Sequence, residues 1–148
     1  MGHLKEYYER IVKLDEWEWE FIASRFTKTI FPKKQIITRQ GDTEIFLSFI
    51  ERGIVRSYIP GDETEVTFNF SFDKEFTCAY DSFLTQTPSD YELQALTDTV
   101  AWQISYTDLQ VVYTHTTVGN YLGRIASEKL YLAKSKRELS LLSRNPTE

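Results

Sequence analysis

Residues 54–70 read IVRSYI-PGDE-TEVTFNF, and this stretch decides the fold. The turn-forming residues Pro60-Gly61-Asp62-Glu63 separate two runs that are rich in β-branched and aromatic side chains. The second run alternates between polar and apolar residues up to Phe70. A period of two is typical of a half-buried strand, and proline, glycine and aspartate favour tight turns. The stretch therefore predicts a β-hairpin.

The same period of two extends outward from the hairpin over residues 28–106. Short runs alternate with turn residues, and the expected strands cover residues 29–31, 35–38, 45–51, 54–59, 64–70, 91–96 and 100–105. Between Lys74 and Ser89 the alternation stops, and Tyr80, Phe83 and Leu84 indicate one short helical turn. Many short strands separated by turns are typical of a sandwich or barrel. The sequence predicts a mainly β protein.

Helical spacing replaces this pattern on both sides of the barrel zone. In residues 1–27 the apolar residues recur at helical intervals, and Asp15 followed by Glu18 resembles a capping box that would start a second short helix. A long helix is expected over residues 107–143. One seam of it carries Val118, Tyr121, Ile125, Glu128, Leu132, Ser135, Leu139 and Leu142. This 3,4-spacing predicts pairing with a second copy of the chain, and packing on the barrel alone is the alternative.

The composition is that of one globular domain, residues 1–148. Hydrophobic residues make up 41% and aromatic residues 15%, and the net charge is −5. A net negative chain is no electrostatic partner for nucleic acid or for anionic lipid. No apolar run is suited to a signal peptide or to a membrane span. We therefore expect a soluble cytoplasmic protein that has no membrane partner.

Catalytic chemistry has little support in this sequence. His3 and His115 are the only histidines and fall outside the barrel zone, and the single cysteine, Cys78, excludes an internal disulfide and a multi-thiolate metal site. A Cys78/His115 pair is conceivable, but a buried apolar thiol and a surface histidine are the preferred interpretation. No glycine-rich phosphate loop is present. We expect no enzyme activity, no metal and no cofactor.

Three stretches carry a resemblance to a known family. They are residues 31–42 (FPKKQIITRQGD), residues 49–58 (FIERGIVRSY), and residues 94–98 with 104–109 (QALTD and ISYTDL). They resemble the sensory half of Crp/Fnr-type bacterial transcription regulators, most of all the Bacteroidetes-like branch. The resemblance implies a double-stranded β-helix (jelly-roll) barrel of the cyclic-nucleotide-binding type, a long dimerisation helix, and a following helix-turn-helix DNA-binding domain that this chain lacks.

The resemblance also places a ligand cassette between the late helical turn and the next strand. Nucleotide-binding members carry Gly-Glu for the ribose and Arg-Ser/Thr-Ala for the cyclic phosphate, where this chain has Cys78-Ala79 and Ser89-Asp90-Tyr91. No lysine or arginine occurs between Lys74 and Arg124. Because a buried phosphate needs an arginine or an equivalent set of donors, we expect cAMP to bind weakly or not at all.

The expected ligand-binding residues follow from strand alternation and from this alignment. They are Ser57, Asn69, Ser71, Cys78, Ala79, Ser89, Asp90, Tyr91 and Ser135. Arg56 is expected to point out of the barrel. The function predicted first is effector sensing in a dimeric regulator, with an unknown small molecule as effector. A genuine cyclic-nucleotide binder with an unconventional cassette and an interaction domain with a filled pocket are the alternatives.

Overall fold

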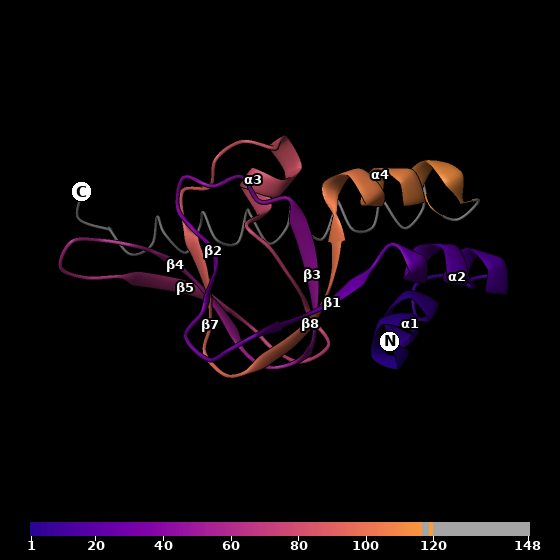
Figure 1. Ribbon diagram of the computed structural model, residues 1–148, viewed down its shortest axis with the longest axis horizontal. Helices are drawn as coiled ribbons and strands as arrows, with labels where there is room; N and C mark the ends of the chain where they lie inside the picture. The colour runs from indigo at the N-terminus through magenta and orange to yellow at the C-terminus, as the bar shows by residue number, and fades with distance from the viewer. Residues whose placement is uncertain (117–118, 120–148) are drawn as a thin grey trace.

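Two antiparallel four-stranded sheets form the body of the computed structural model, which describes residues 1–116 and 119 (Figure 1). The first sheet has the order β1 (Thr27–Phe31), β8 (Thr99–Ser105), β3 (Phe46–Arg52) and β6 (Phe76–Thr77). The second has the order β2 (Ile36–Thr38), β7 (Glu92–Ala95), β4 (Val55–Ile59) and β5 (Val66–Ser71). This arrangement confirms the prediction of a mainly β, jelly-roll-like fold.

The hairpin that the sequence indicated most clearly joins β4 to β5. Val55 pairs with Ser71 and Ser57 with Asn69, and the register then shifts so that Tyr58 pairs with Thr67. Phe68 is the extra residue at this bulge. The hairpin extends away from the rest of the barrel in Figure 1, and residues 61–65 at its outer end are exposed.

Gly53 connects the two sheets at the turn between β3 and β4. Its φ is +135°, and a Cβ atom at this position would lie 2.3 Å from Oγ1 of Thr99. Only glycine tolerates both the backbone conformation and the close approach. The Gly53 N–H donates to Oδ1 of Asp73 at 2.7 Å, which fixes the turn against the end of β5.

The segment between β5 and β7 contains a short strand as well as a helix. Helix α3 (Tyr80–Thr85) confirms the expected helical turn and ends at Gln86, where φ is 53°. Strand β6 was not predicted, because two residues cannot display an alternating pattern. β6 pairs with β3 through Ser48 and Phe49 and brings the start of α3 to the barrel.

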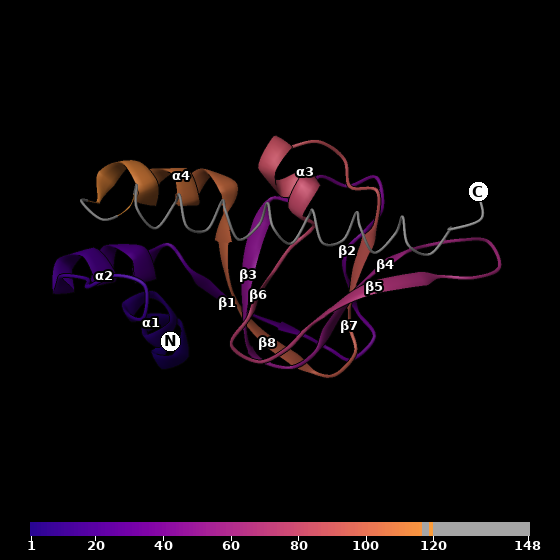
Figure 2. The same cartoon turned by 180° about the vertical axis from the view of Figure 1, so that it is seen from behind.

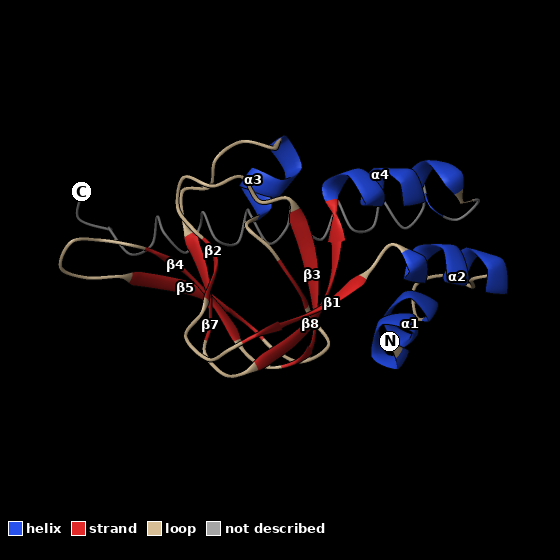
Figure 3. Ribbon diagram, in the orientation of Figure 1, coloured by secondary structure: helices blue, strands red, loops and turns tan. Residues whose placement is uncertain are grey.

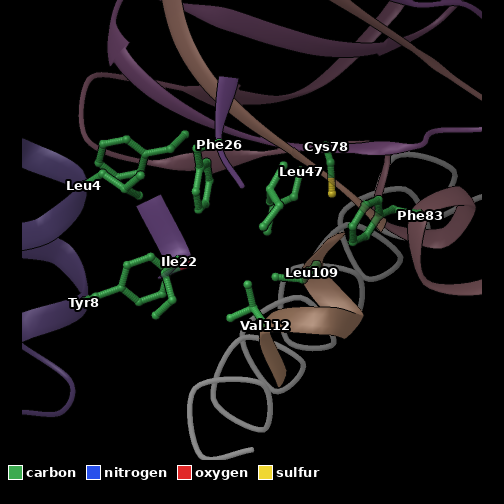
Figure 4. Packing of buried hydrophobic residues seen from close by; sticks show 11 residues of the cluster. Leu4, Tyr8, Ile22, Phe26, Leu47, Cys78, Phe83, Leu109 and Val112 are labelled. Carbon is green, nitrogen blue, oxygen red and sulfur yellow. The ribbon is translucent and has the colours of Figure 1, made fainter. Parts of the chain in front are cut away.

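The remaining helices gather at one end of the barrel (Figures 2 and 3). Helix α1 (Gly2–Glu9), helix α2 (Glu16–Ser24) and helix α4 (Tyr106–His115) cover the outward face of β3 and β8. Figure 4 shows the apolar cluster between them, with side chains that include Leu4, Ile22, Leu47, Phe83 and Leu109. Burial of such side chains is the main stabilisation of these short helices.

The second short helix is confirmed, because Asp15 is the N-cap of α2, but the Asp15 side chain makes no capping hydrogen bond, so the expected capping box is not formed. Of the helix expected over 107–143, the structure describes α4 up to His115, and Thr116 after it is extended, with φ −113° and ψ 148°. Residues 117, 118 and 120–143 of this expected helix lie outside the described residues. The hydroxyl of Thr116 donates to the Val112 carbonyl at 3.0 Å, one turn earlier in α4.

Part of the predicted site and the whole predicted dimer seam lie outside the described residues. These positions are Val118, Tyr121, Ile125, Leu132, Ser135, Leu139 and Leu142. Among the described helices, none is both long and apolar enough to cross a membrane.

Candidate functional site

Strands β4 and β5 bring three of the predicted ligand-binding residues together. Ser57 and Asn69 are paired across the hairpin, and Ser71 lies two residues further along the same face of β5. Ser57 and Ser71 are buried and Asn69 is half-buried. The Asn69 amide nitrogen lies 3.4 Å from Oγ of Ser71. The inner face of the second sheet therefore carries a small, uncharged polar group.

The cassette, defined here as residues 78–91, contributes only some of its predicted residues to the barrel interior. Ala79 and Tyr91 belong to the interior cluster with Val55. Cys78 instead packs in the cluster beneath the helices, beside Phe83 (Figure 4). Burial raises the pKa of the Cys78 thiol, so the thiol stays protonated and is a poor nucleophile.

Ser89 is buried and Asp90 is exposed. The Ser89 hydroxyl donates to the carbonyl of Tyr91 at 2.7 Å and accepts from the Tyr91 N–H at 3.2 Å. Asp90 therefore does not join the interior group, and the Ser89 side chain is already bonded within its own turn.

Tyr91, the last residue of the cassette, packs against the hairpin. It is 1% exposed, and its ring meets the ring of Phe68 edge to face at a centroid distance of 4.9 Å. Its hydroxyl accepts a 2.8 Å hydrogen bond from the backbone N–H of Tyr80, the first residue of α3. Aromatic side chains thus occupy the interior next to the cassette.

Arg56 lies on the outer face of the second sheet, as predicted. Its guanidinium donates to Gln94 at 2.9 Å, to Thr67 at 3.1 Å and to the carboxylate of Glu65 at 3.2 Å, and it stacks over the ring of Tyr58 at 3.9 Å. These contacts hold the guanidinium on the outer face. It cannot at the same time neutralise an anion inside the barrel.

Glu44 is the residue that the sequence analysis missed. It precedes β3, is 6% exposed, and accepts hydrogen bonds from the Thr38 hydroxyl and from the N–H groups of Phe46 (3.2 Å) and Ala79 (3.5 Å). Burial raises the pKa of Glu44, and these hydrogen bonds act in the opposite direction. The only signal in the sequence was a carboxylate directly before an apolar strand, and that signal is weak because strand ends are usually solvated.

The backbone on both sides of Glu44 is also joined to the cassette. The Gly41 N–H donates to the Ser89 carbonyl at 2.8 Å, and the Ser89 N–H donates to the Asp42 carbonyl at 2.9 Å. Gly41 has a φ of +90°, a conformation that favours glycine. The loop before β3 and the end of the cassette thus form one hydrogen-bonded unit.

The inner face of the second sheet is polar and carries no charged side chain at Ser57, Asn69 or Ser71. Among residues 1–116 and 119, no group of three or more His, Cys, Asp or Glu side chains could hold a metal ion. What the interior can do chemically is hydrogen-bond a neutral group, through Ser57, Asn69 and Ser71.

The family model of the cyclic nucleotide-binding domain matches residues 28–115, more than half of the chain. No curated protein sequence matches the chain. The placement in the Bacteroidetes-like branch stays a prediction.

Solved structures with the same fold include the catabolite activator protein of Thermus thermophilus, at 23% identity and a TM-score of 0.68, with 88% of this chain and 61% of that chain covered. The c-di-GMP responsive regulator CLP of Xanthomonas campestris matches at 22% identity and a TM-score of 0.66, with 85% of this chain and 60% of that chain covered. The sensor domain of the transcriptional regulator DNR from Pseudomonas aeruginosa matches at 15% identity and a TM-score of 0.66, with 82% of this chain and 81% of that chain covered. This chain therefore spans less than two thirds of the first two proteins.

Proposed function

Because this chain belongs to the cyclic nucleotide-binding domain family, we propose that it is a non-catalytic effector-sensing domain of a dimeric, cytoplasmic transcription regulator of the Crp/Fnr type. In this proposal the barrel of residues 28–106 senses the effector and residues 107–143 pair with a second copy. A helix-turn-helix domain outside this chain would contact DNA. The likeness in fold to an activator protein and to the sensor domain of a transcriptional regulator supports the proposal.

The observation that carries the proposal is the chemistry of the cassette. Where nucleotide-binding members have charged residues, this chain has the buried side chains of Ala79 and Ser89, and Tyr91 fills the adjacent interior. The nearest basic candidate, Arg56, is bonded on the outer face. A cyclic phosphate placed here would lose its counter-charge, so we propose an effector other than cAMP.

Isothermal titration with cAMP and with cGMP tests this proposal. Loss of a buried charged hydrogen bond costs several kcal/mol, so the affinity should be about 1000-fold or more below that of a member with the full cassette. A dissociation constant in the micromolar range would instead favour a genuine cyclic-nucleotide-binding module with an unconventional cassette.

A second candidate is an interaction domain whose pocket is filled. The packing of Tyr91 against Phe68 inside the barrel favours this reading. Xenon enters empty apolar cavities and shifts the NMR signals of their lining. Shifts at Tyr91 and Val55 under xenon pressure would indicate an open interior and favour effector sensing, whereas unshifted signals would favour the interaction domain.

The proposed dimer is tested by Leu132→Glu. Like charges facing each other across a two-fold seam repel, so the variant should be a monomer where the unmodified chain is a dimer. Size exclusion with light scattering measures the masses of the unmodified chain and of the variant at about tens of micromolar. A weak dimer would dissociate at much lower concentrations. An unmodified chain that runs as a monomer would contradict the pairing.

A further inference from the structure

Glu44 has a buried carboxylate that accepts three hydrogen bonds. In the part of the chain that the structure describes, no lysine, arginine or histidine forms an ion pair with it. A buried charge is normally paired, and an unpaired one is retained only where several hydrogen bonds replace the lost water. The three donors to this carboxylate come from β2, β3 and the cassette: the Thr38 hydroxyl and the N–H groups of Phe46 and Ala79.

The backbone of Glu44 reinforces these contacts. Its N–H donates to Oγ of Ser82 at 2.8 Å, and its carbonyl accepts from the side-chain amide (Nε2) of Gln86 at 3.0 Å. The Ser82 hydroxyl in turn donates to the carbonyl of Thr87. A single residue outside the cassette therefore contacts its beginning, its helix and the turn that follows the helix.

From this geometry we infer that Glu44 is an internal anionic ligand of the cassette, which it orders without any bound effector. The inference rests on the proposed function, because it treats the cassette as the effector site. Oxygen Oε2 holds the Ala79 N–H and Oε1 holds the Phe46 N–H, so the carboxylate bridges the cassette to β3. The Tyr91 hydroxyl accepts a hydrogen bond from the next amide, that of Tyr80. The backbone N–H groups of both Ala79 and Tyr80 are therefore bonded to side chains of the protein itself.

This role restricts what can bind. An anionic effector would have to displace Glu44 from the Ala79 amide or lie beside a second negative charge in a poorly solvated place. Either route weakens its binding, since like charges at short distance repel strongly where water is excluded. A neutral effector meets neither obstacle, and Glu44 is thus a positioning residue that also sets the charge of the ligand.

The test is chemical rescue of Glu44→Ala by acetate, with no effector present. The truncation leaves a space of about one carboxylate and unpaired amides, so exchange of the backbone amides of residues 79–86 should become at least about tenfold faster than in the unmodified protein. Sodium acetate at about 0.1 M should bind in that space and restore most of the protection by mass action. Sodium chloride at equal ionic strength should not.

Glu92→Ala is the matched control. Its carboxylate accepts from the Gln40 N–H at 3.0 Å and from the Tyr58 hydroxyl at 2.8 Å, next to the same loop but on the outer face of the sheet. Acetate should change cassette exchange in this variant by less than about twofold, because the vacated site is open to water. Unchanged exchange in Glu44→Ala, or faster exchange that acetate does not slow, would overturn the inference.

Glu44→Gln keeps the test decisive if the truncated variant does not fold. Whichever way the glutamine amide lies, its NH₂ group faces either the Phe46 N–H or the Ala79 N–H, and two donors cannot bond each other. One of these two amides should exchange about tenfold faster while the amides of β8 stay protected. Full protection at both amides would show that the anion is not what holds the cassette. Neither variant experiment depends on which effector the domain binds, so an error in the proposed function would leave these results interpretable.

Discussion

The two sheets of the barrel are built from similar strands but are stabilised differently in the described residues. The first sheet has its outer face covered by α1, α2 and α4, with Phe49 and Ile104 fully buried there. The second sheet carries a polar network on its outer face, in which the Tyr58 hydroxyl donates to Glu92, and Arg56 donates to Gln94 and stacks over the Tyr58 ring. The difference shows that the first sheet supplies most of the apolar core, whereas the second supplies the inner face on which the candidate site is built.

The largest expected effect is in the first sheet. Phe49 contacts the rings of Tyr7 and Phe76 and is fully buried. Phe49→Ala should lower the free energy of unfolding by about 3–5 kcal/mol, because the cavity adds to the lost apolar burial. Urea denaturation measures it. Phe70→Ala, the same substitution at a half-exposed position on β5, is the control, and an equal loss there would show that the two sheets do not differ in this way.

A smaller effect is expected inside the second sheet. Tyr91→Phe keeps the ring against Phe68 but leaves the Tyr80 N–H without its acceptor. The unfolding free energy should fall by about 1–3 kcal/mol, the cost of an unsatisfied buried donor. Thermal unfolding together with exchange of the Tyr80 amide checks this value.

Tyr58→Phe serves as the comparison on the opposite face. Burial and the hydrogen bond to Glu92 raise the pKa of Tyr58 to about 12, but the carboxylate partner can be rehydrated when the hydroxyl is removed. Tyr58→Phe should therefore lower the free energy of unfolding by less than Tyr91→Phe does. A larger loss at Tyr58 would mean that the outer network, rather than the interior contact with the cassette, orders this sheet.

The hairpin could be predicted because its information is local. Alternation in residues 64–70 is visible in the sequence, and Pro60-Gly61-Asp62-Glu63 marks the turn between the two strands. The outward direction of Arg56 followed from the same alternation and is confirmed by its bonds. Such features depend on neighbours within a few residues, which is the range that a sequence pattern covers.

Glu44 and the end of α4 could not be predicted for the opposite reason. The role of Glu44 depends on Ala79 and Ser82, which lie 35 and 38 residues away in the chain. No periodicity marks such a pair. Helix α4 ends at Thr116, whose hydroxyl donates to the Val112 carbonyl, and the apolar spacing gave no sign of this end. Cys78 was expected at the ligand site because the alignment with the family's cassette placed it there, whereas the structure packs it in the cluster beneath the helices.

The smallest expected effect belongs to the outer network. Arg56→Gln removes the ion pair with Glu65, whose side chain is 48% exposed, and the stack on Tyr58. An ion pair with an exposed partner contributes little, and a cation–π contact contributes about 0.5–2 kcal/mol, so the unfolding free energy should fall by about 1 kcal/mol. A double-mutant cycle with Glu65→Gln separates the two contributions, and the coupling between the two side chains should shrink in about 1 M salt, where the Debye length is short. Arg56→Lys keeps the charge but loses the planar fork and the stack, so it should recover only the salt-sensitive part. If Arg56→Gln destabilised the domain more than Tyr91→Phe, the guanidinium would be a structural centre of the second sheet. The proposed contrast between the two faces of β4 would then fail, because the outer face would contribute at least as much to stability as the inner face.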